Sequence, residues 1–322
     1  MRLSTNMIYQ QNMNSVSNAQ SLWQDTGVQL STGNRVNKPS DDPLAASQAV
    51  MVQQAQAQND QFAIARTFAN QTMGQEENIL SNVTSAIQDA QSVIVNAGDG
   101  ALSDDDRSSL ATKLQGIKDQ LVNMANSTDG NGRYIFAGYK SDKPPYTVDA
   151  TTGVVTYNGG DQAISQQVDA SRTMTVSHTG TNVFNTLTSD AVKEPGTPPA
   201  PSETDIFKTL DTAIAALKTP KANFADPADY MTAIDKSNRG LRNSLNNVLS
   251  VRSTLGTQMD ELDKLDSMGA DTKQINGDKL TALVGTDWTA AISQYTLQQV
   301  ALQASYKTFT GMQGLSLFQM NS

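Results

Sequence analysis

Cysteine is absent from this chain of 322 residues, and His178 is its only histidine. Without thiols there is no disulfide, no cysteine nucleophile and no cysteine-ligated metal site. One imidazole is also too few for a multi-histidine zinc site. We therefore expect no metal and no cofactor.

Basic charge and long apolar runs are also scarce. Lys and Arg number 23 against 32 Asp and Glu, which gives a net charge of -9. Nucleic-acid affinity needs clustered basic side chains, so DNA and RNA are excluded as main partners. No stretch approaches the roughly 20 apolar residues that span a bilayer, and the first residues lack the apolar core of a secretory signal. We expect no membrane partner and no classical export signal.

Apolar residues at helical spacing dominate the first half of the chain. Five of them follow steps of 4 and 3 residues, after Ser103 and three aspartates that suit a capped helix start: Leu110, Leu114, Ile117, Leu121 and Met124. This helix is predicted to end near Asn126. Upstream, the stretch from Pro43 to Ala97 contains no internal proline, and it predicts one long helix that is capped by Asp42, with Gly74 as a candidate break.

The middle of the chain has a different pattern. Residues 132–192 contain short segments rich in β-branched and aromatic residues, RYIFAGYK, GVVTYNGG, ISQQVDA and RTMTVSH, separated by Gly and Asp turns. These predict a small β-rich domain. The proline-rich segment EPGTPPAPSE follows, and it predicts a semi-rigid connector.

Helical patterns return from Ile206 to Leu217 and again from Leu241 to Leu265, and GADTKQING is predicted to interrupt them. Both ends of the chain then carry apolar seams. The eleven seam residues are the candidate assembly interface: Tyr9, Met13, Val16, Trp23, Leu30, Trp288, Ile292, Tyr295, Leu302, Tyr306 and Phe309.

The predicted fold is mostly α, a long antiparallel helical bundle of N- and C-terminal segments with a small β-rich insertion. Five parts are expected: an N-terminal assembly helix at 1–40, the first half of a helical rod at 41–130, a β-rich outer domain at 131–202, the second half of the rod at 203–277 and a C-terminal assembly helix at 278–322.

The terminal helices predict association. An isolated helix is marginal in water, and burial of one large apolar side chain contributes about 1.5–3 kcal/mol. When the two terminal helices pair only with each other, much of their apolar surface stays exposed to water. Our hypothesis is that both ends are mobile in the monomer and become ordered on polymerisation. The alternative, that the seams are only the core of a soluble bundle, remains open on periodicity alone.

Three segments carry a family resemblance. QLSTGNRVNKPSDDPLAAS, residues 29–47, is similar to the signature that joins the first two helices of flagellin-family proteins. DGNGRYIFAGYKSDKPPY, residues 129–146, and LQASYKTFTGMQGLSLFQ, residues 302–319, resemble the hook-associated proteins of type three, which are the hook-filament junction members of that family.

The resemblance implies a structural subunit of the bacterial flagellum, exported unfolded by the flagellar type III apparatus and located outside the cell. It implies a homo-oligomeric ring between the other hook-filament junction protein and flagellin. It also implies a cytoplasmic export chaperone that binds the C-terminal helix, here from Trp288 to Phe309. The alternatives are a short flagellin that forms the filament itself and a secreted enzyme with coiled-coil arms.

Residues that suggest chemistry have simpler explanations. Asp41 and Asp42 are adjacent, so their side chains diverge, and a turn with a helix cap is expected in place of an acid–base pair. The run that begins at Asp104 fits a first helical turn. Asp129 opens no calcium loop, because Lys140 occupies the twelfth position where an EF-hand has glutamate. We predict no catalytic residue, and Trp23 and Trp288 are expected to pack.

Overall fold

The computed structural model describes residues 5–319, which form two compact units. The terminal unit contains the residues up to Asp60 together with those from Gly269 onward. The central unit is Gln61–Met268. Two long helices, α2 (Pro43–Ala97) and α6 (Pro227–Val284), contribute residues to both units. The mostly helical fold with helical ends and a small β region in the middle was correctly predicted.

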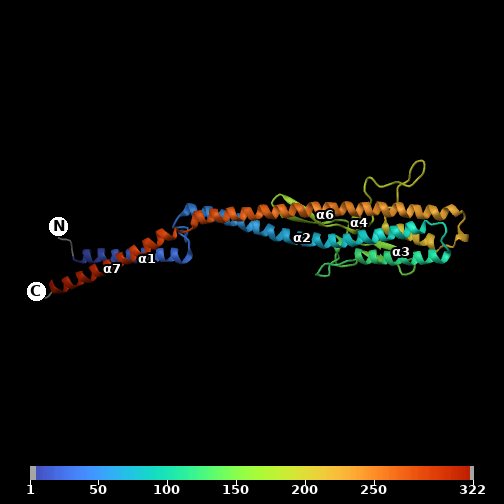
Figure 1. The fold of residues 1–322 in the computed structure, drawn as a ribbon. Coiled ribbons are helices and arrows are strands. Elements are labelled where there is room, and N and C mark those ends of the chain that lie inside the picture. The colour runs from blue at the N-terminus through green and yellow to red at the C-terminus, as the bar shows by residue number, and fades with distance from the viewer. Residues whose placement is uncertain (1–4, 320–322) are drawn as a thin grey trace. The chain divides into compact units, whose positions relative to one another are not determined.

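In the terminal unit, α1 (Thr5–Thr32) and α7 (Trp288–Gln319) lie side by side (Figure 1). The first part of α2 and the last part of α6 belong to the same unit. Where the structure describes their side chains, large apolar residues such as Leu22 of α1 and Leu297 of α7 remain exposed beside this contact.

The central unit is built on α3 (Asp104–Ala125) and α5 (Ile206–Lys218), which pack together beside α2 and α6. The predicted start of α3 is confirmed, since Ser103 and Asp106 form a reciprocal capping box. Its predicted seam also faces the core, where Leu114 and Leu121 are completely buried. Local periodicity and a local cap were sufficient to define this helix.

Two predicted interruptions are absent from the structure. α2 passes through Gly74 without a break, and α6 continues through residues 269–277, so the expected break at GADTKQING is wrong. A glycine inside a helix costs only about 1 kcal/mol, and tertiary contacts override that preference. Here Asn59 of α2 donates to the Gly269 carbonyl at 2.8 Å and Lys273 pairs with Asp60 at 3.0 Å.

The β region consists of two separate antiparallel pairs. β1 (Tyr146–Val148) pairs with β2 (Val155–Tyr157), and β3 (Ile164–Asp169) pairs with β4 (Arg172–Ser177). Two short helices flank them, η1 (Ile135–Ala137) and α4 (Gly180–Phe184). The strands expected in GVVTYNGG, ISQQVDA and RTMTVSH are therefore present, although they are short.

The segment RYIFAGYK, however, is not a strand. Ile135, Phe136 and Ala137 form the 3-10 helix η1, and all three side chains are buried. A strand would direct alternate side chains to opposite faces, so it could not bury three in succession. Gly138 ends the turn at φ 56°, where an added Cβ would lie 2.5 Å from the Gln162 carbonyl oxygen, so the close approach requires glycine.

An aromatic cluster joins the β region to the helices. The Tyr146 ring contacts Phe184 at 5.7 Å and Phe207 of α5 at 5.2 Å between centroids, and Phe136 contacts Phe184 at 5.5 Å. The Tyr146 hydroxyl donates to Asn185 at 2.6 Å. Burial raises the pKa of Tyr146 well above its ordinary value. The strands are thus attached to the helical core by ring packing.

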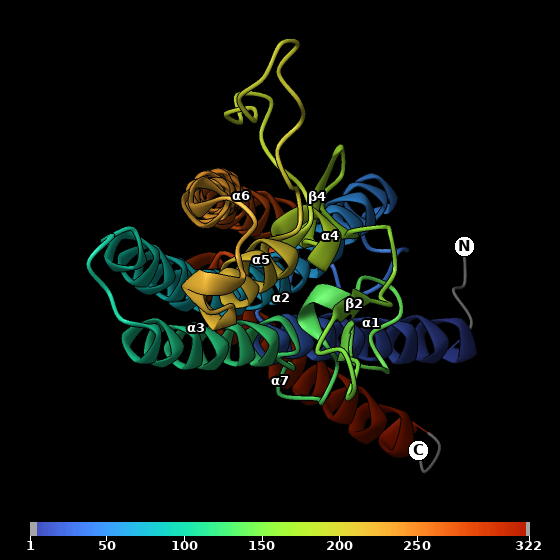
Figure 2. The same cartoon turned by 90° about the vertical axis from the view of Figure 1, so that its right-hand side faces the viewer.

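The segment between α4 and α5 projects away from the helices of the central unit (Figures 1 and 2). Its base is held on α6, where the Asn243 side chain binds both the amide and the carbonyl of Val192. Glu194 binds Arg239 of α6 at 3.0 Å. The exposed tip contains the proline-rich sequence, as expected for a connector that fits neither helix nor central strand.

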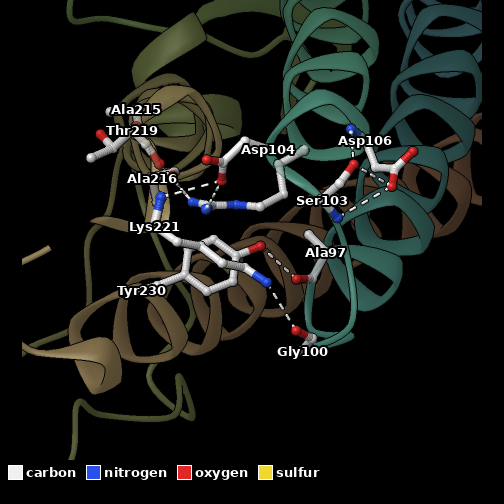
Figure 3. A network of polar contacts seen from close by, with 11 residues as sticks. Ala97, Gly100, Ser103, Asp104, Asp106, Ala215, Ala216, Thr219, Lys221 and Tyr230 are labelled. Atoms are coloured by element: carbon white, nitrogen blue, oxygen red, sulfur yellow. Dashed lines mark hydrogen bonds and ion pairs between the residues drawn. The ribbon is translucent and has the colours of Figure 1, made fainter. Parts of the chain in front are cut away.

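A buried arginine closes one end of the central unit (Figure 3). Arg107 of α3 is completely buried and donates to the carbonyls of Ala216, at 2.7 Å, and Thr219, at 2.8 Å. Ala216 lies in the last turn of α5, and its carbonyl has no helical partner because residue 220 is proline. The guanidinium also lies 4.1 Å from the centre of the Tyr230 ring. Arg107 therefore caps α5 and joins it to α3.

Candidate assembly surface

The contact between α1 and α7 depends on two aromatic pairs. Trp23 stacks on Tyr295 with centroids 5.4 Å apart, and Tyr9 contacts Phe309 at 5.3 Å. Next to the Trp23–Tyr295 pair, the Thr26 hydroxyl donates to the Gln298 side-chain oxygen at 2.6 Å. Residues about 270 positions apart in the sequence thus contact each other along the line where the two helices meet.

The structure divides the eleven predicted interface residues into two groups. Six are partly buried within the terminal unit: Val16, Trp23, Leu30, Tyr295, Leu302 and Phe309. Five are 46–54% exposed: Tyr9, Met13, Trp288, Ile292 and Tyr306. The first group packs where the two helices meet, and Tyr9 joins it through its contact with Phe309. Met13, Trp288, Ile292 and Tyr306 present apolar surface outward.

Sequence reasoning missed several exposed apolar residues of the same unit. Leu297 and Val300 of α7 are 72% and 63% exposed, and Leu22 of α1 is 56% exposed. Ala291 of α7 is buried, although the prediction did not include it among the seam residues. The overlooked signal was that apolar residues occur on every side of α7, a pattern typical of helices buried all round.

Charge is nearly absent from both helices. Asp25 is the only charged residue of α1, and Lys307 is the only one of α7. Burying an unpaired charge costs several kcal/mol, and such a penalty opposes tight packing of charged helices. These two helices can therefore be enclosed by others at little electrostatic cost.

The ends of α1 and α7 are joined by a pair of interlocked loops. Arg35 donates its amide to the Val284 carbonyl at 2.7 Å, and the Thr286 amide donates to the Gly33 carbonyl at 3.0 Å. Gly33 has φ 72°, and a Cβ added there would lie 3.4 Å from the Trp288 ring. The backbone of one loop thus supports the inner side of Trp288, while 54% of this residue stays exposed.

Asp41 and Asp42 stabilise this loop and the start of α2. Asp41 accepts from the Lys38 and Asn37 amides, and these hydrogen bonds lower its pKa. Asp42 accepts from the Ala45 amide, the largest cause of its lowered pKa, and pairs with Arg35 at 3.3 Å. The interpretation of the two carboxylates as a turn and a helix cap is confirmed.

The remaining candidate groups have local partners. Asp129 accepts from the Asn131 and Arg133 amides in a turn. His178 follows β4 and lies with its Nδ1 3.0 Å from the buried Glu76 carboxylate. Among residues 5–319, no group of three or more His, Cys, Asp or Glu is arranged to hold a metal, and no helix is long and apolar enough to cross a bilayer.

Comparisons with known proteins agree with this architecture. The family model described as the bacterial flagellin N-terminal helical region matches residues 3–141. The chain is 59% identical to the flagellar hook-associated protein 3 of Salmonella typhimurium and 57% identical to that of Escherichia coli, over all 322 residues and 100% of each chain. A solved structure, the flagellar junction protein FlgL from Legionella pneumophila, aligns with a TM-score of 0.61 at 21% identity, over 74% of this chain and 100% of that one.

Proposed function

The chain belongs to the flagellar hook-associated protein 3 family and is a structural component of the bacterial flagellum, and from this premise we propose that it forms the ring that joins hook to filament. The ring is composed of copies of this chain. Its neighbours are the other hook-filament junction protein and flagellin. The role is mechanical, and we assign it no catalytic residue.

One observation carries the proposal. The terminal helices carry large apolar side chains that are about half exposed or more, and each helix has a single charged residue. At about 25 cal/mol per Å² of buried apolar area, such surfaces favour enclosure by further helices. We propose the eleven predicted residues as part of this interface, and the five exposed ones as those that contact other subunits.

A junction between two unlike tubes needs two unlike axial faces. Contacts along the axis are therefore heterologous, since a two-fold contact would present the same face to both neighbours. We retain as proposals the division into assembly helices at 1–40 and 278–322, helical segments at 41–130 and 203–277, and an outward-facing β-rich part at 131–202.

We further propose that the chain is exported through the flagellar type III apparatus. Membership of the family supports this, and without cysteine no disulfide can form inside or outside the cell. A chaperone that covers α7 before export fits a helix with apolar residues on every side. The terminal helices would then become ordered in the assembled ring.

Deletion of the gene tests the junction role. We expect cells with intact hooks, no filaments and flagellin released into the medium, and restoration of filaments by the wild-type chain. A short flagellin would behave differently, because purified protein would itself polymerise into long filaments under salting-out conditions. Normal filaments in the deletion strain would refute the proposal.

A further inference from the structure

Asparagine is followed by glycine at three places in the chain, Asn131–Gly132, Asn158–Gly159 and Asn276–Gly277. This dipeptide is chemically labile, because glycine has no side chain to shield its amide nitrogen from the asparagine side chain. When that nitrogen reaches the asparagine Cγ, a ring can close between them. The three sites are equivalent in sequence, so their surroundings in the fold decide which of them can react.

The Asn276–Gly277 site is protected inside helix α6. Asn276 is only 9% exposed, and the helix continues on both sides of it. A helix fixes the backbone dihedrals and directs each amide N–H to the carbonyl four residues earlier. The Gly277 nitrogen can therefore meet the Asn276 side chain only after the interior of the helix has opened, which costs more than the opening of a surface turn.

The Asn158–Gly159 site is held by hydrogen bonds and by packing. The Asn158 side chain donates through Nδ2 to the Thr147 hydroxyl at 2.8 Å, and its backbone amide donates to the Pro145 carbonyl at 2.7 Å. Gly159 is buried, and a Cβ added there would collide with the Tyr157 ring. Rotation of the side chain toward Gly159 would break the bond to Thr147, and the backbone has no room to adjust.

The Asn131–Gly132 site lies exposed in a turn. Both residues are exposed, and the Asn131 side-chain amide makes no hydrogen bond within residues 5–319. A Cβ added at Gly132 would meet nothing within 4 Å. The Gly132 amide donates to the Asp129 carbonyl at 3.0 Å, and this turn bond is the contact that must open before the nitrogen can react. A hydrogen bond in an exposed turn opens at little cost.

We propose that Asn131 is a modification site that deamidates spontaneously in the folded chain. The Gly132 nitrogen attacks the Asn131 Cγ, the side-chain nitrogen leaves as ammonia together with the proton of the Gly132 amide, and a cyclic succinimide forms. Water then opens either C–N bond of the ring, which leaves aspartate or isoaspartate at position 131. The reaction consumes one water, releases one ammonia and requires no enzyme, oxidant or reductant. Neither the reaction nor its test depends on the proposed ring of subunits, because both concern the folded chain alone.

The products change the turn and leave the core in place. The Asp129 carboxylate accepts from the Asn131 and Arg133 amides and pairs with the Arg133 guanidinium at 3.3 Å, so a new carboxylate at position 131 lies close to an existing one. Isoaspartate also adds one carbon to the main chain, which shifts the Asp129 amide away from the Arg133 carbonyl that it meets at 2.8 Å. The chain beyond the turn is anchored separately, because the Ile135 amide donates to the Ser127 carbonyl at 3.0 Å.

Peptide mapping by mass spectrometry tests the proposal. The purified full-length chain is incubated at mildly alkaline pH in water labelled with heavy oxygen, which marks each newly formed acid. In the folded chain we expect Asn131 to convert at least about tenfold faster than Asn158 and Asn276, a ratio that corresponds to about 1.4 kcal/mol in the barrier. In the same chain unfolded in urea, all three should convert at similar rates.

Asn131→Gln is the matched variant, because its longer side chain would have to close a larger and less favourable ring. Conversion at position 131 should disappear in this variant, whereas the unfolding temperature should stay unchanged, since the side chain is exposed. An Asn131 that stays intact in the folded wild-type chain would overturn the proposal. Conversion of Asn158 or Asn276 at the same rate as Asn131 in the folded chain would overturn it as well, because the fold would then not select the site.

Discussion

Replacement of Trp288 by alanine separates what this ring does in the monomer from what it does in the assembly. An aromatic side chain buries about 150–250 Å², and burial contributes about 25 cal/mol per Å². Trp288 is 54% exposed, so the part still available to a partner is worth roughly 2–3 kcal/mol per copy. The part already buried, against the Gly33 loop, is worth roughly 1.7–2.9 kcal/mol on the same basis.

Two measurements follow from this estimate. Amide exchange on the dilute monomer should show only a modest loss of protection in α1 and α7 for Trp288→Ala. Filament attachment should fall strongly, because the loss is repeated at every copy of the ring. Trp23→Ala is the matched comparison, since Trp23 stacks on Tyr295 within the monomer. It should expose the amides of both helices to exchange far more.

Two results would contradict this prediction. If flagella carrying Trp288→Ala hold their filaments as well as the wild type, the exposed half of the ring contributes nothing to assembly. Equal loss of amide protection in the two variants would also contradict it, because the monomer would then use both tryptophans alike.

Three further predictions concern stability. Arg107→Met should lower the free energy of unfolding of the central unit by about 3–5 kcal/mol in urea titrations, since the carbonyls of Ala216 and Thr219 lose their donor. Arg133 is 66% exposed, so Arg133→Met should cost less than about 1 kcal/mol, and similar losses in the two variants would contradict the capping role. Gly33→Val should loosen the joined loops, because φ 72° is strained for a β-branched residue, and amide exchange at residues 33–36 should accelerate. Gly100→Val, at a position with open space, should leave exchange at residues 33–36 unchanged. The pKa of Asp41 is lowered in the folded chain, so its contribution to stability is present above the unfolded value of 3.8 and is lost as the pH falls through the folded value; Asp41→Asn should reduce the acid sensitivity of the loop, and an unchanged pH profile would refute this assignment.

Much of the helical structure could be predicted because its signals are local. The capping box at Ser103 and the apolar steps of α3 are set by residues three or four positions apart, and the structure contains both as expected. The same holds for Asp42 at the start of α2, where the carboxylate binds the amide three residues on. Signals of this kind need no knowledge of the rest of the chain.

The predictions were wrong where contacts between residues far apart in the sequence determine the local secondary structure. α6 continues through Gly269 because its carbonyl binds Asn59 of α2, 210 positions away. The segment around Phe136 is a 3-10 turn because that ring packs on Phe184. Propensity favoured a break in the first case and a strand in the second, and in each the tertiary contact overrode a preference of about 1 kcal/mol.

The candidate site shows the same division. Sequence alone identified two terminal helices with apolar seams, because periodicity is a property of each segment. Only the tertiary structure showed that Trp23 turns toward Tyr295 while Trp288 stays half exposed, because the inner face of a helix is fixed by the partner it meets.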